Sequence, residues 1–268
     1  MRGVQALVSP IRPAERLAVS VVVPVYNSAA SLDELCERIV STMSATLGSA
    51  SWELILVNDG SEDASWDRVV ALSGEFPEIR GIDLTRNWGQ HNALLAGIHA
   101  ARGEVVVTLD DDLQNPPEEI PRLIEALGPQ LDVVYGVPIA VRQPVYRRMG
   151  GAAVRATIGA LTRRREVALA TGFRAFRRDI ADDLPETSGR RIALDGMLRA
   201  VTVRFGSIAV DHQPRREGRS NYSLARLARL AFTEVATDLG PGGKGNHRAP
   251  SYRIRTVTAP QLSDDGRG

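Results

Sequence analysis

The stretch VSVVVPV at residues 19–25 is a run of β-branched residues with no polar alternation. Such a run is typical of a strand that is buried on both faces of a parallel sheet. Similar apolar runs recur along the first half of the chain, at residues 52–58, 81–84, 104–109 and 132–135. Helical patterns lie between them, at residues 31–47, 65–74, 92–101 and from residue 116 onward. This alternation predicts an α/β fold with a mostly parallel central sheet and helices on both faces.

Length and composition narrow the class of protein. The chain has 268 residues, of which 43% are hydrophobic and 24% are charged, so it can build one sizeable core and is not wholly disordered. No window approaches the roughly 18 apolar residues of a membrane-spanning helix. Residues 1–16 lack the apolar segment of a signal peptide. The single cysteine, Cys36, excludes an internal disulfide and a cysteine-built metal site. We therefore expect a cytoplasmic protein.

Positive charge is concentrated in the second half of the chain. Residues 1–141 carry 9 Lys and Arg against 20 Asp and Glu, whereas residues 142–219 carry 17 against 8. This asymmetry predicts an anionic partner for the second half, with a solvated basic surface as the alternative. Residues 142–165 mix arginines with apolar side chains, which suits either a helix on a membrane surface or a helix packed on the sheet.

Polar clusters follow three of the expected strands. They are Tyr26-Asn27, Asp59-Gly60-Ser61 and Asp110-Asp111-Asp112. Ligands of open parallel sheets bind outside the carboxyl ends of the strands. A simple turn would explain any one cluster, but three at consecutive strand ends predict one shared crevice.

The acidic run is the sharpest of these features. Asp110 and Asp112 are two residues apart and Gln114 continues the alternation, so their side chains can point to the same side. Two carboxylates and an amide oxygen form a hard oxygen site that suits Mg²⁺ or Mn²⁺. The alternative is capping of a helix that opens at Pro116, but capping needs one acid and this run has three.

Several common catalytic motifs are absent from the sequence. The first strand is not followed by the glycine-rich loop of dinucleotide-binding proteins, and no nucleotide-binding P-loop occurs. The G-x-S-x-G turn of serine hydrolases is also missing, and the four histidines show no metal-ligand spacing.

Short motifs between residues 18 and 235 point to one family. They are PVYN at 24–27, NDGSxD at 58–63, RNxG at 86–89 and LAGxxxAxG at 95–103. In order and spacing they resemble family 2 glycosyltransferases of the GT-A fold. The run LDDDLQNPPE at 109–118 is the most specific, and is similar to the signature of the dolichol-phosphate mannosyltransferase and polyprenyl-phosphate glycosyltransferase branch. The segments GFR at 172–174 and RxxGxSxY at 215–222 also resemble that branch.

The resemblance implies a nucleotide pocket in the first half of the chain. Pro24, Tyr26 and Asn27 would line the pocket for base and ribose, and Asp59 would hold the base. The family often has an acid where this chain has Ser28, so one nucleotide contact differs.

The resemblance also implies a metal and phosphate site. Asp110 would contact the ribose or the diphosphate and would hold Mg²⁺ or Mn²⁺ together with Asp112 and Gln114. The residues expected to face phosphates of donor or acceptor are Arg174, Arg215 and Ser220. Catalysis is expected to depend on the two aspartates and on Arg174.

The activity implied is that of an inverting, metal-dependent glycosyltransferase. It would move a sugar from a nucleotide-sugar of the GDP-mannose or UDP-hexose type to a polyprenyl or dolichyl phosphate. One alternative is a soluble glycan, protein or small-molecule acceptor, and another is a non-catalytic subunit that binds nucleotide-sugars. We expect peripheral association with the cytoplasmic face of the membrane or a separate membrane partner subunit, and no nucleic acid partner.

We expect one catalytic domain between two extensions. Residues 1–17 form an N-terminal extension, and residues 18–236 form the GT-A domain. Within that domain, residues 18–138 are the half that binds nucleotide-sugar and metal, and residues 139–236 the half that binds acceptor. Residues 237–268 lack a periodic apolar pattern and are expected to be a disordered tail.

Overall fold

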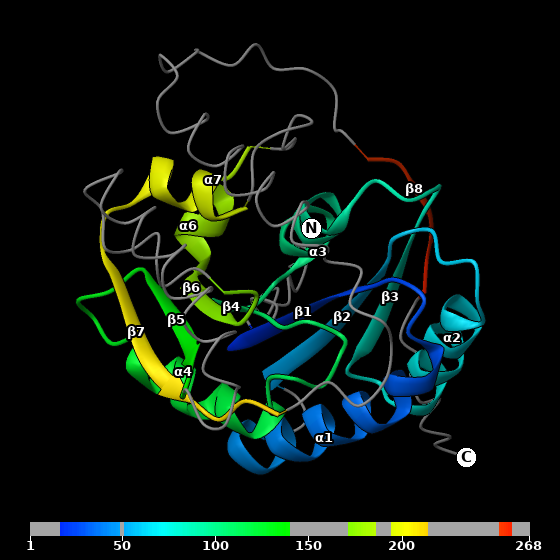
Figure 1. Ribbon diagram of the computed structural model, residues 1–268, viewed down its shortest axis with the longest axis horizontal. Helices are drawn as coiled ribbons and strands as arrows, with labels where there is room; N and C mark the ends of the chain where they lie inside the picture. The colour runs from blue at the N-terminus through cyan, green and yellow to red at the C-terminus, as the bar shows by residue number, and fades with distance from the viewer. Residues whose placement is uncertain (1–16, 49–50, 140–170, 186–193, 214–251, 259–268) are drawn as a thin grey trace, which may run out of the picture.

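The centre of the fold is a parallel sheet. The computed structural model describes residues 17–48, 51–139, 171–185, 194–213 and 252–258. Within these ranges the sheet has eight strands in the order β7-β5-β6-β4-β1-β2-β3-β8 (Figure 1). Strand β1 (Val19–Val25) lies between β2 (Trp52–Asn58) and β4 (Val105–Thr108), and β3 (Ile79–Leu84) pairs with β2; all of these pairings are parallel. The predicted α/β fold with a mostly parallel sheet is confirmed.

Antiparallel strands extend the sheet on both sides of this centre. Strand β6 (Arg174–Arg177) runs antiparallel between β4 and β5 (Val133–Pro138). Strand β7 (Phe205–Val210) pairs parallel with β5. Strand β8 (Ile254–Val257) pairs antiparallel with β3 at the opposite edge.

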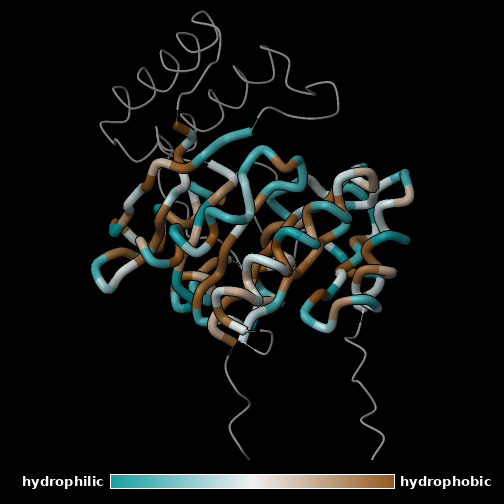
Figure 2. The backbone as a smooth tube through the Cα atoms, turned by 90° about the horizontal axis from the view of Figure 1, so that it is seen from below, coloured by the Kyte–Doolittle hydropathy of each residue, from teal (hydrophilic) through white to brown (hydrophobic). Residues whose placement is uncertain are grey.

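Helices cover both faces of the sheet, as predicted (Figure 1). One hydrophobic cluster joins the sheet to α1 (Ala29–Leu47), α2 (Ser65–Glu75) and α4 (Ile120–Ala126), which follows the short 3₁₀ helix η2 (Pro117–Glu119). A second cluster joins the other face to α3 (Gln90–Ala100), α6 (Arg178–Asp182) and α7 (Leu194–Val201). In Figure 2 hydrophobic residues are concentrated toward the inside of the fold, while much of its periphery is hydrophilic.

Helix α3 lies close to the sheet because of a glycine. A Cβ atom on Gly97 would come within 2.4 Å of Val22 Cγ1 and 2.9 Å of Val57 Cγ2. These distances are shorter than carbon atoms tolerate, so only glycine fits while α3 keeps this position over β1 and β2. The close packing fixes where the first turn of α3 lies relative to the carboxyl ends of those strands.

The C-terminal region contains ordered structure that the sequence did not predict. Residues 237–268 were expected to be a disordered tail, but Ile254–Val257 form β8, and Thr258 N donates to Gly81 O at 2.9 Å. The expectation is therefore wrong for residues 252–258. All four residues of β8 are exposed, so the strand has no alternation of buried and exposed residues. A search for hydrophobic periodicity therefore does not detect it.

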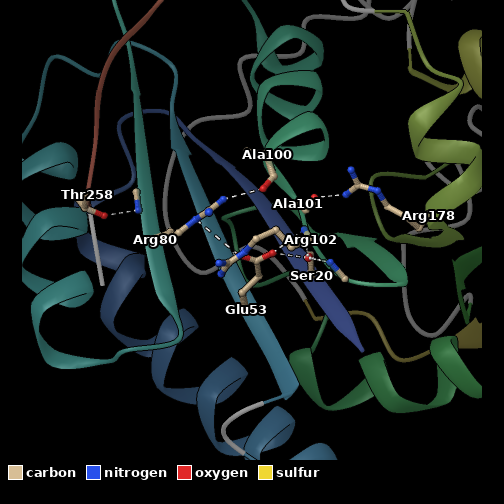
Figure 3. A network of polar contacts seen from close by, with 10 residues as sticks. Ser20, Glu53, Arg80, Ala100, Ala101, Arg102, Arg178 and Thr258 are labelled. Atoms are coloured by element: carbon tan, nitrogen blue, oxygen red, sulfur yellow. Dashed lines mark hydrogen bonds and ion pairs between the residues drawn. The ribbon is translucent and has the colours of Figure 1, made fainter. Parts of the chain in front are cut away.

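A buried carboxylate ties together the amino ends of the central strands (Figure 3). Glu53 is 1% exposed and lies at the start of β2. Its Oε1 accepts hydrogen bonds from Ser20 Oγ at 2.7 Å and from Arg102 N at 2.8 Å, and its Oε2 accepts from Arg102 Nη2 at 2.8 Å. Arg80 Nε lies 3.7 Å from Oε2. The charge of Glu53 is thus compensated by two arginines at the edge opposite the polar clusters.

Replacing this carboxylate should destabilise the whole sheet. We expect Glu53→Ala to lower the free energy of unfolding by about 3 kcal/mol, because Arg80 would be left half-buried without its counter-ion. Urea denaturation followed by circular dichroism measures the effect. Glu37 is exposed on α1, so Glu37→Ala should change stability by less than about 0.5 kcal/mol. Equal stability of the two variants would show that the Glu53 cluster contributes nothing.

Candidate active site

The loops that follow β1 and β2 are hydrogen-bonded to each other. Asn27 N donates to Ser61 Oγ at 3.0 Å, and Glu62 N donates to Asn27 Oδ1 at 2.8 Å. Asn27 has a φ of +53°, in the left-handed region that asparagine tolerates better than most residues. Ser28 N donates to Ser65 Oγ at 2.9 Å, at the start of α2. The first two polar clusters therefore form one continuous surface.

Asp111 joins the third cluster to the first. Its Oδ2 accepts hydrogen bonds from Ser28 Oγ and from Tyr26 N, the latter at 3.1 Å. Ser31 Oγ in α1 donates to the backbone oxygen of Asp111 at 2.9 Å. Burial raises the pKa of Asp111, and the bond from Ser28 acts in the opposite direction. The middle acid of the run thus fastens the loop after β4 to the loop after β1, and the three clusters meet as predicted.

The aspartates on either side of Asp111 are partly exposed. Asp110 Oδ1 accepts a hydrogen bond from Gln90 Nε2 at 2.6 Å, at the start of α3. Asp112 Oδ1 accepts from Gln114 N at 3.1 Å, and Leu113 between them has a φ of +58°. Asp110 is thus held by a side chain of α3, and Asp112 by the backbone of the tight turn that leads to Gln114.

Gly172 packs directly against the carboxylate of Asp110. A Cβ atom on Gly172 would lie 2.2 Å from Asp110 Oδ2, so a side chain there would displace the carboxylate. Thr108 Oγ1 donates to Gly172 O at 2.7 Å and accepts from Arg174 Nε at 3.1 Å. The segment that leads into β6 therefore sets the position of Asp110.

Asp59 organises the loop between β3 and α3. Its carboxylate is 3% exposed and accepts backbone hydrogen bonds from Trp88 N at 2.7 Å and Gly89 N at 2.9 Å. Burial raises the pKa of Asp59 to about 6, and the two backbone bonds act against that rise. Gly60, at a φ of +67°, packs so closely on this loop that a Cβ would lie 2.4 Å from Arg86 C. Asp59, which was expected to hold the base, thus uses both carboxylate oxygens to fix this loop.

The other residues expected in the nucleotide pocket differ in exposure. Tyr26 is 41% exposed, and Asn27 is also exposed beside it. Pro24 is buried within β1. Leu109 N donates to Val22 O on the side of β1 that faces β4. Because β4 ends at Thr108, no strand in the described part of the chain lies opposite Pro24 on that side to accept a backbone N–H. A proline, which lacks this N–H, is therefore tolerated at this position. Pro24 thus lies below the surface on which Tyr26 and Asn27 stand.

Arg174 does not lie open to phosphates in this structure. Its side chain is 3% exposed and forms an ion pair with Asp195 in α7. Tyr135 OH also donates to Asp195, at 2.9 Å, and burial raises the pKa of Tyr135. The guanidinium therefore contacts Asp195, from α7, and Thr108. A role of Arg174 toward a phosphate of donor or acceptor stays a prediction.

Some contributors to the site were missed by the sequence analysis. They include Gln90, which contacts Asp110, and Trp88, whose ring lies 4.0 Å from the Arg86 guanidinium. The RNWG motif at 86–89 indicated a structured loop at this position, because glycine before a helix marks a sharp turn into the helix. Arg215 and Ser220 lie outside the described residues.

The donor atoms at this edge fit a hard divalent cation. Two aspartates and the amide of Gln114 follow one short strand, and oxygen ligands of this kind suit Mg²⁺ or Mn²⁺. In the part of the chain that the structure describes, no three His, Cys, Asp or Glu side chains are grouped as metal ligands. A cation here would be held by Asp110 and Asp112 together with the amide oxygen of Gln114.

The chain belongs to glycosyl transferase family 2, whose model matches residues 20–184. This membership confirms the resemblance seen in the motifs. The undecaprenyl-phosphate 4-deoxy-4-formamido-L-arabinose transferase of Salmonella typhimurium is 38% identical over 218 residues. The match covers 81% of this chain but only 66% of that protein. The transferase of the same name from Salmonella choleraesuis is 37% identical over the same length.

Solved structures confirm the fold. Glucosyl-3-phosphoglycerate synthase from Mycobacterium tuberculosis, in complex with Mn²⁺, UDP and phosphoglyceric acid, superposes with a TM-score of 0.62 at 21% identity. The match covers 85% of this chain and 81% of that one. The same enzyme with Mn²⁺, UDP and glucosyl-3-phosphoglycerate gives a TM-score of 0.63 at 19% identity, over 92% and 91% of the chains. Among the described residues, no helix is long and apolar enough to span a membrane.

The raised pKa of Asp59 predicts a pH dependence of stability. With a folded-state pKa of about 6 against an ordinary 3.8, the folded protein holds this proton more tightly than the unfolded chain. Protonated Asp59 therefore stabilises the folded protein fully below the ordinary pKa of 3.8. This stabilisation is lost as the pH rises through about 6. Relative to Asp59→Asn, we expect the wild type to lose about 2 kcal/mol of unfolding free energy between pH 4 and pH 7.

Urea denaturation at several pH values checks this expectation. Taking the difference from Asp59→Asn removes the contributions of the other acids. Parallel pH profiles for the two proteins would mean that the pKa of Asp59 is not raised.

Proposed function

We propose that the protein is an inverting glycosyltransferase that transfers a sugar from a nucleotide-sugar to a polyprenyl phosphate. The observation that carries the proposal is the junction made by Asp111. It brings the loop with Tyr26 and Asn27, the expected nucleotide contacts, against the expected metal ligands Asp110 and Asp112. Family membership supports the reaction class, and the names of the relatives support the acceptor class.

The residues present suit displacement at the anomeric carbon. A phosphate oxygen of the acceptor attacks that carbon, the bond to the donor's diphosphate oxygen breaks, and the electron pair leaves with the nucleoside diphosphate. Asp110, Asp112 and Gln114 would hold a divalent cation, which would supply stabilisation for the charge that develops on this leaving group. A lipid phosphate is already ionised at neutral pH, so the attack needs no strong general base.

The acceptor is proposed to be met at a membrane surface. Residues 142–219 carry 17 Lys and Arg against 8 Asp and Glu, and an anionic lipid surface attracts such a segment. Peripheral binding or a separate membrane subunit would each bring the chain to its lipid substrate. The basic segment lies largely outside the described residues, so the sequence alone supports this part of the proposal.

A panel of donors tests the proposed function. Purified protein is incubated with UDP- and GDP-sugars, Mg²⁺ or Mn²⁺ and a short-chain polyprenyl phosphate, and the lipid product is detected by mass spectrometry. We expect a glycosylated lipid phosphate with at least one donor, and none after chelation of the metal. Transfer only to soluble acceptors would favour the alternative acceptor class. Donor binding without any transfer would indicate a non-catalytic subunit.

Asp112 provides the sharpest test of the metal assignment. We expect Asp112→Asn to lower kcat/KM on the order of a hundredfold or more, because it removes a charged ligand while preserving the shape of the turn. Asp183 is exposed near the end of α6, so Asp183→Asn serves as the matched control and should leave kcat/KM unchanged. Wild-type turnover by Asp112→Asn at saturating metal would show that this carboxylate is not a ligand.

A further inference from the structure

Strand β8 supplies the counter-ion of a buried carboxylate in β3. Asp83 is 1% exposed, and its Oδ2 accepts a hydrogen bond from Arg255 Nη1 at 2.9 Å. Its other oxygen, Oδ1, accepts from Asn58 Nδ2 at 2.7 Å. A carboxylate buried to this extent is costly unless it is paired and hydrogen-bonded. In the described part of the chain, Arg255 is the cation that pairs with Asp83.

The contact continues from Asp83 to the turn after β2. Because Asn58 directs its amide nitrogen to Asp83, its amide oxygen faces the other way, where it accepts from Ser61 N at 3.2 Å. Ser61 in turn holds Asn27 N at 3.0 Å. An unbroken chain of hydrogen bonds therefore runs from the exposed edge strand to two of the predicted nucleotide loops.

A second route runs through Thr85. Its backbone N donates to Arg253 O at 2.9 Å, and its carbonyl oxygen accepts from Arg255 Nη2 at 2.8 Å. Thr85 Oγ1 accepts from Trp88 Nε1 at 3.3 Å, and Trp88 N donates to Asp59. Arg255 thus contacts two elements near Asp59. One is β3, which is hydrogen-bonded to the turn at 59–61 through Asn58, and the other is the loop at 85–89. Figure 1 shows β8 running beside β3 at this edge.

We propose that Arg255 is a positioning residue for the nucleotide of the donor. By neutralising Asp83 and holding Thr85, it fixes the turn at 59–61 and the loop at 85–89 in the spacing that the nucleoside needs. Arg255 acts through these groups and does not itself touch the donor. The inference rests on the proposed function, because it assumes a nucleotide-sugar donor.

The structure offers a matched control immediately before the same strand. Arg253 is exposed and contacts Thr85 only through its backbone oxygen. Replacing its side chain keeps the strand pairing and changes the net charge by the same amount as replacing Arg255. If β8 served only to cover the edge of the sheet, the two arginines would be equivalent for nucleotide binding.

The experiment compares full-length wild type, Arg255→Gln, Arg255→Lys and Arg253→Gln. Dissociation constants for UDP and for GDP are measured by titration calorimetry with Mn²⁺ present, and KM and kcat for the donor are measured in parallel. We expect Arg255→Gln to weaken binding of the preferred nucleotide and to raise donor KM on the order of tenfold, because only a minor fraction of the protein would then hold the two loops in the spacing that binds the nucleotide. We expect kcat to stay unchanged, Arg255→Lys to recover part of the loss, and Arg253→Gln to match the wild type.

A double variant keeps the test decisive if Arg255→Gln folds poorly. Asp83→Asn combined with Arg255→Gln removes the buried charge together with its partner, so the fold is spared while β8 remains disconnected from Asn58. This double variant should also bind the nucleotide about tenfold more weakly. Wild-type affinity in the folded Arg255 variants would overturn the inference alone. A wild-type chain that binds neither UDP nor GDP would overturn the proposed function and the inference with it.

Discussion

The structure depends on the parallel pairing of β4, β1 and β2. Each of these strands is apolar on both sides, so each must be covered by helices on both faces of the sheet. Parallel strands all end at the same edge of the sheet. The direction of the strands alone therefore brings together the polar residues that follow them. The position of the candidate site is therefore a consequence of which residues are buried, and the loops only refine it.

Refinement of that edge relies on carboxylates that bind other segments of the same chain. Asp111 binds the loop after β1, Asp59 binds the loop after β3, and Asp83 anchors the edge strand β8. Each one satisfies backbone or side-chain donors of a neighbouring segment, which fixes the spacing between loops more firmly than hydrophobic contact does. Acidic residues outside the reacting centre thus hold the geometry on which Asp110 and Asp112 depend.

The sequence was sufficient for the central strands, the family and the convergence of the polar clusters, because these follow from local patterns of burial. It was insufficient where a residue's role depends on a partner distant in the chain. Arg174 matches a family motif, but its guanidinium is held by Asp195 from α7. The sequence does not distinguish Asp111 from its two acidic neighbours, whereas the structure shows that Ser28 donates a hydrogen bond to it. Residues 252–258 carry no periodic pattern because their pairing uses backbone and charged groups.

At the carboxyl edge of the sheet Asp83 is matched by Arg255, but Asp59 and Asp111 are held in a different way from Glu53, and this difference favours cation binding beside them. At the amino edge, Glu53 is matched by Arg102 and Arg80, so its charge is cancelled locally. At the carboxyl edge, the hydrogen bonds described for Asp59 and Asp111 come from backbone N–H groups and a hydroxyl, which are neutral donors. A hydrogen bond from a neutral donor does not cancel the charge of an ionised carboxylate as a counter-ion does, so negative charge is concentrated around Asp110 and Asp112. In the proposed reaction a divalent cation held by Asp110 and Asp112 would offset this charge and would let an anionic diphosphate approach.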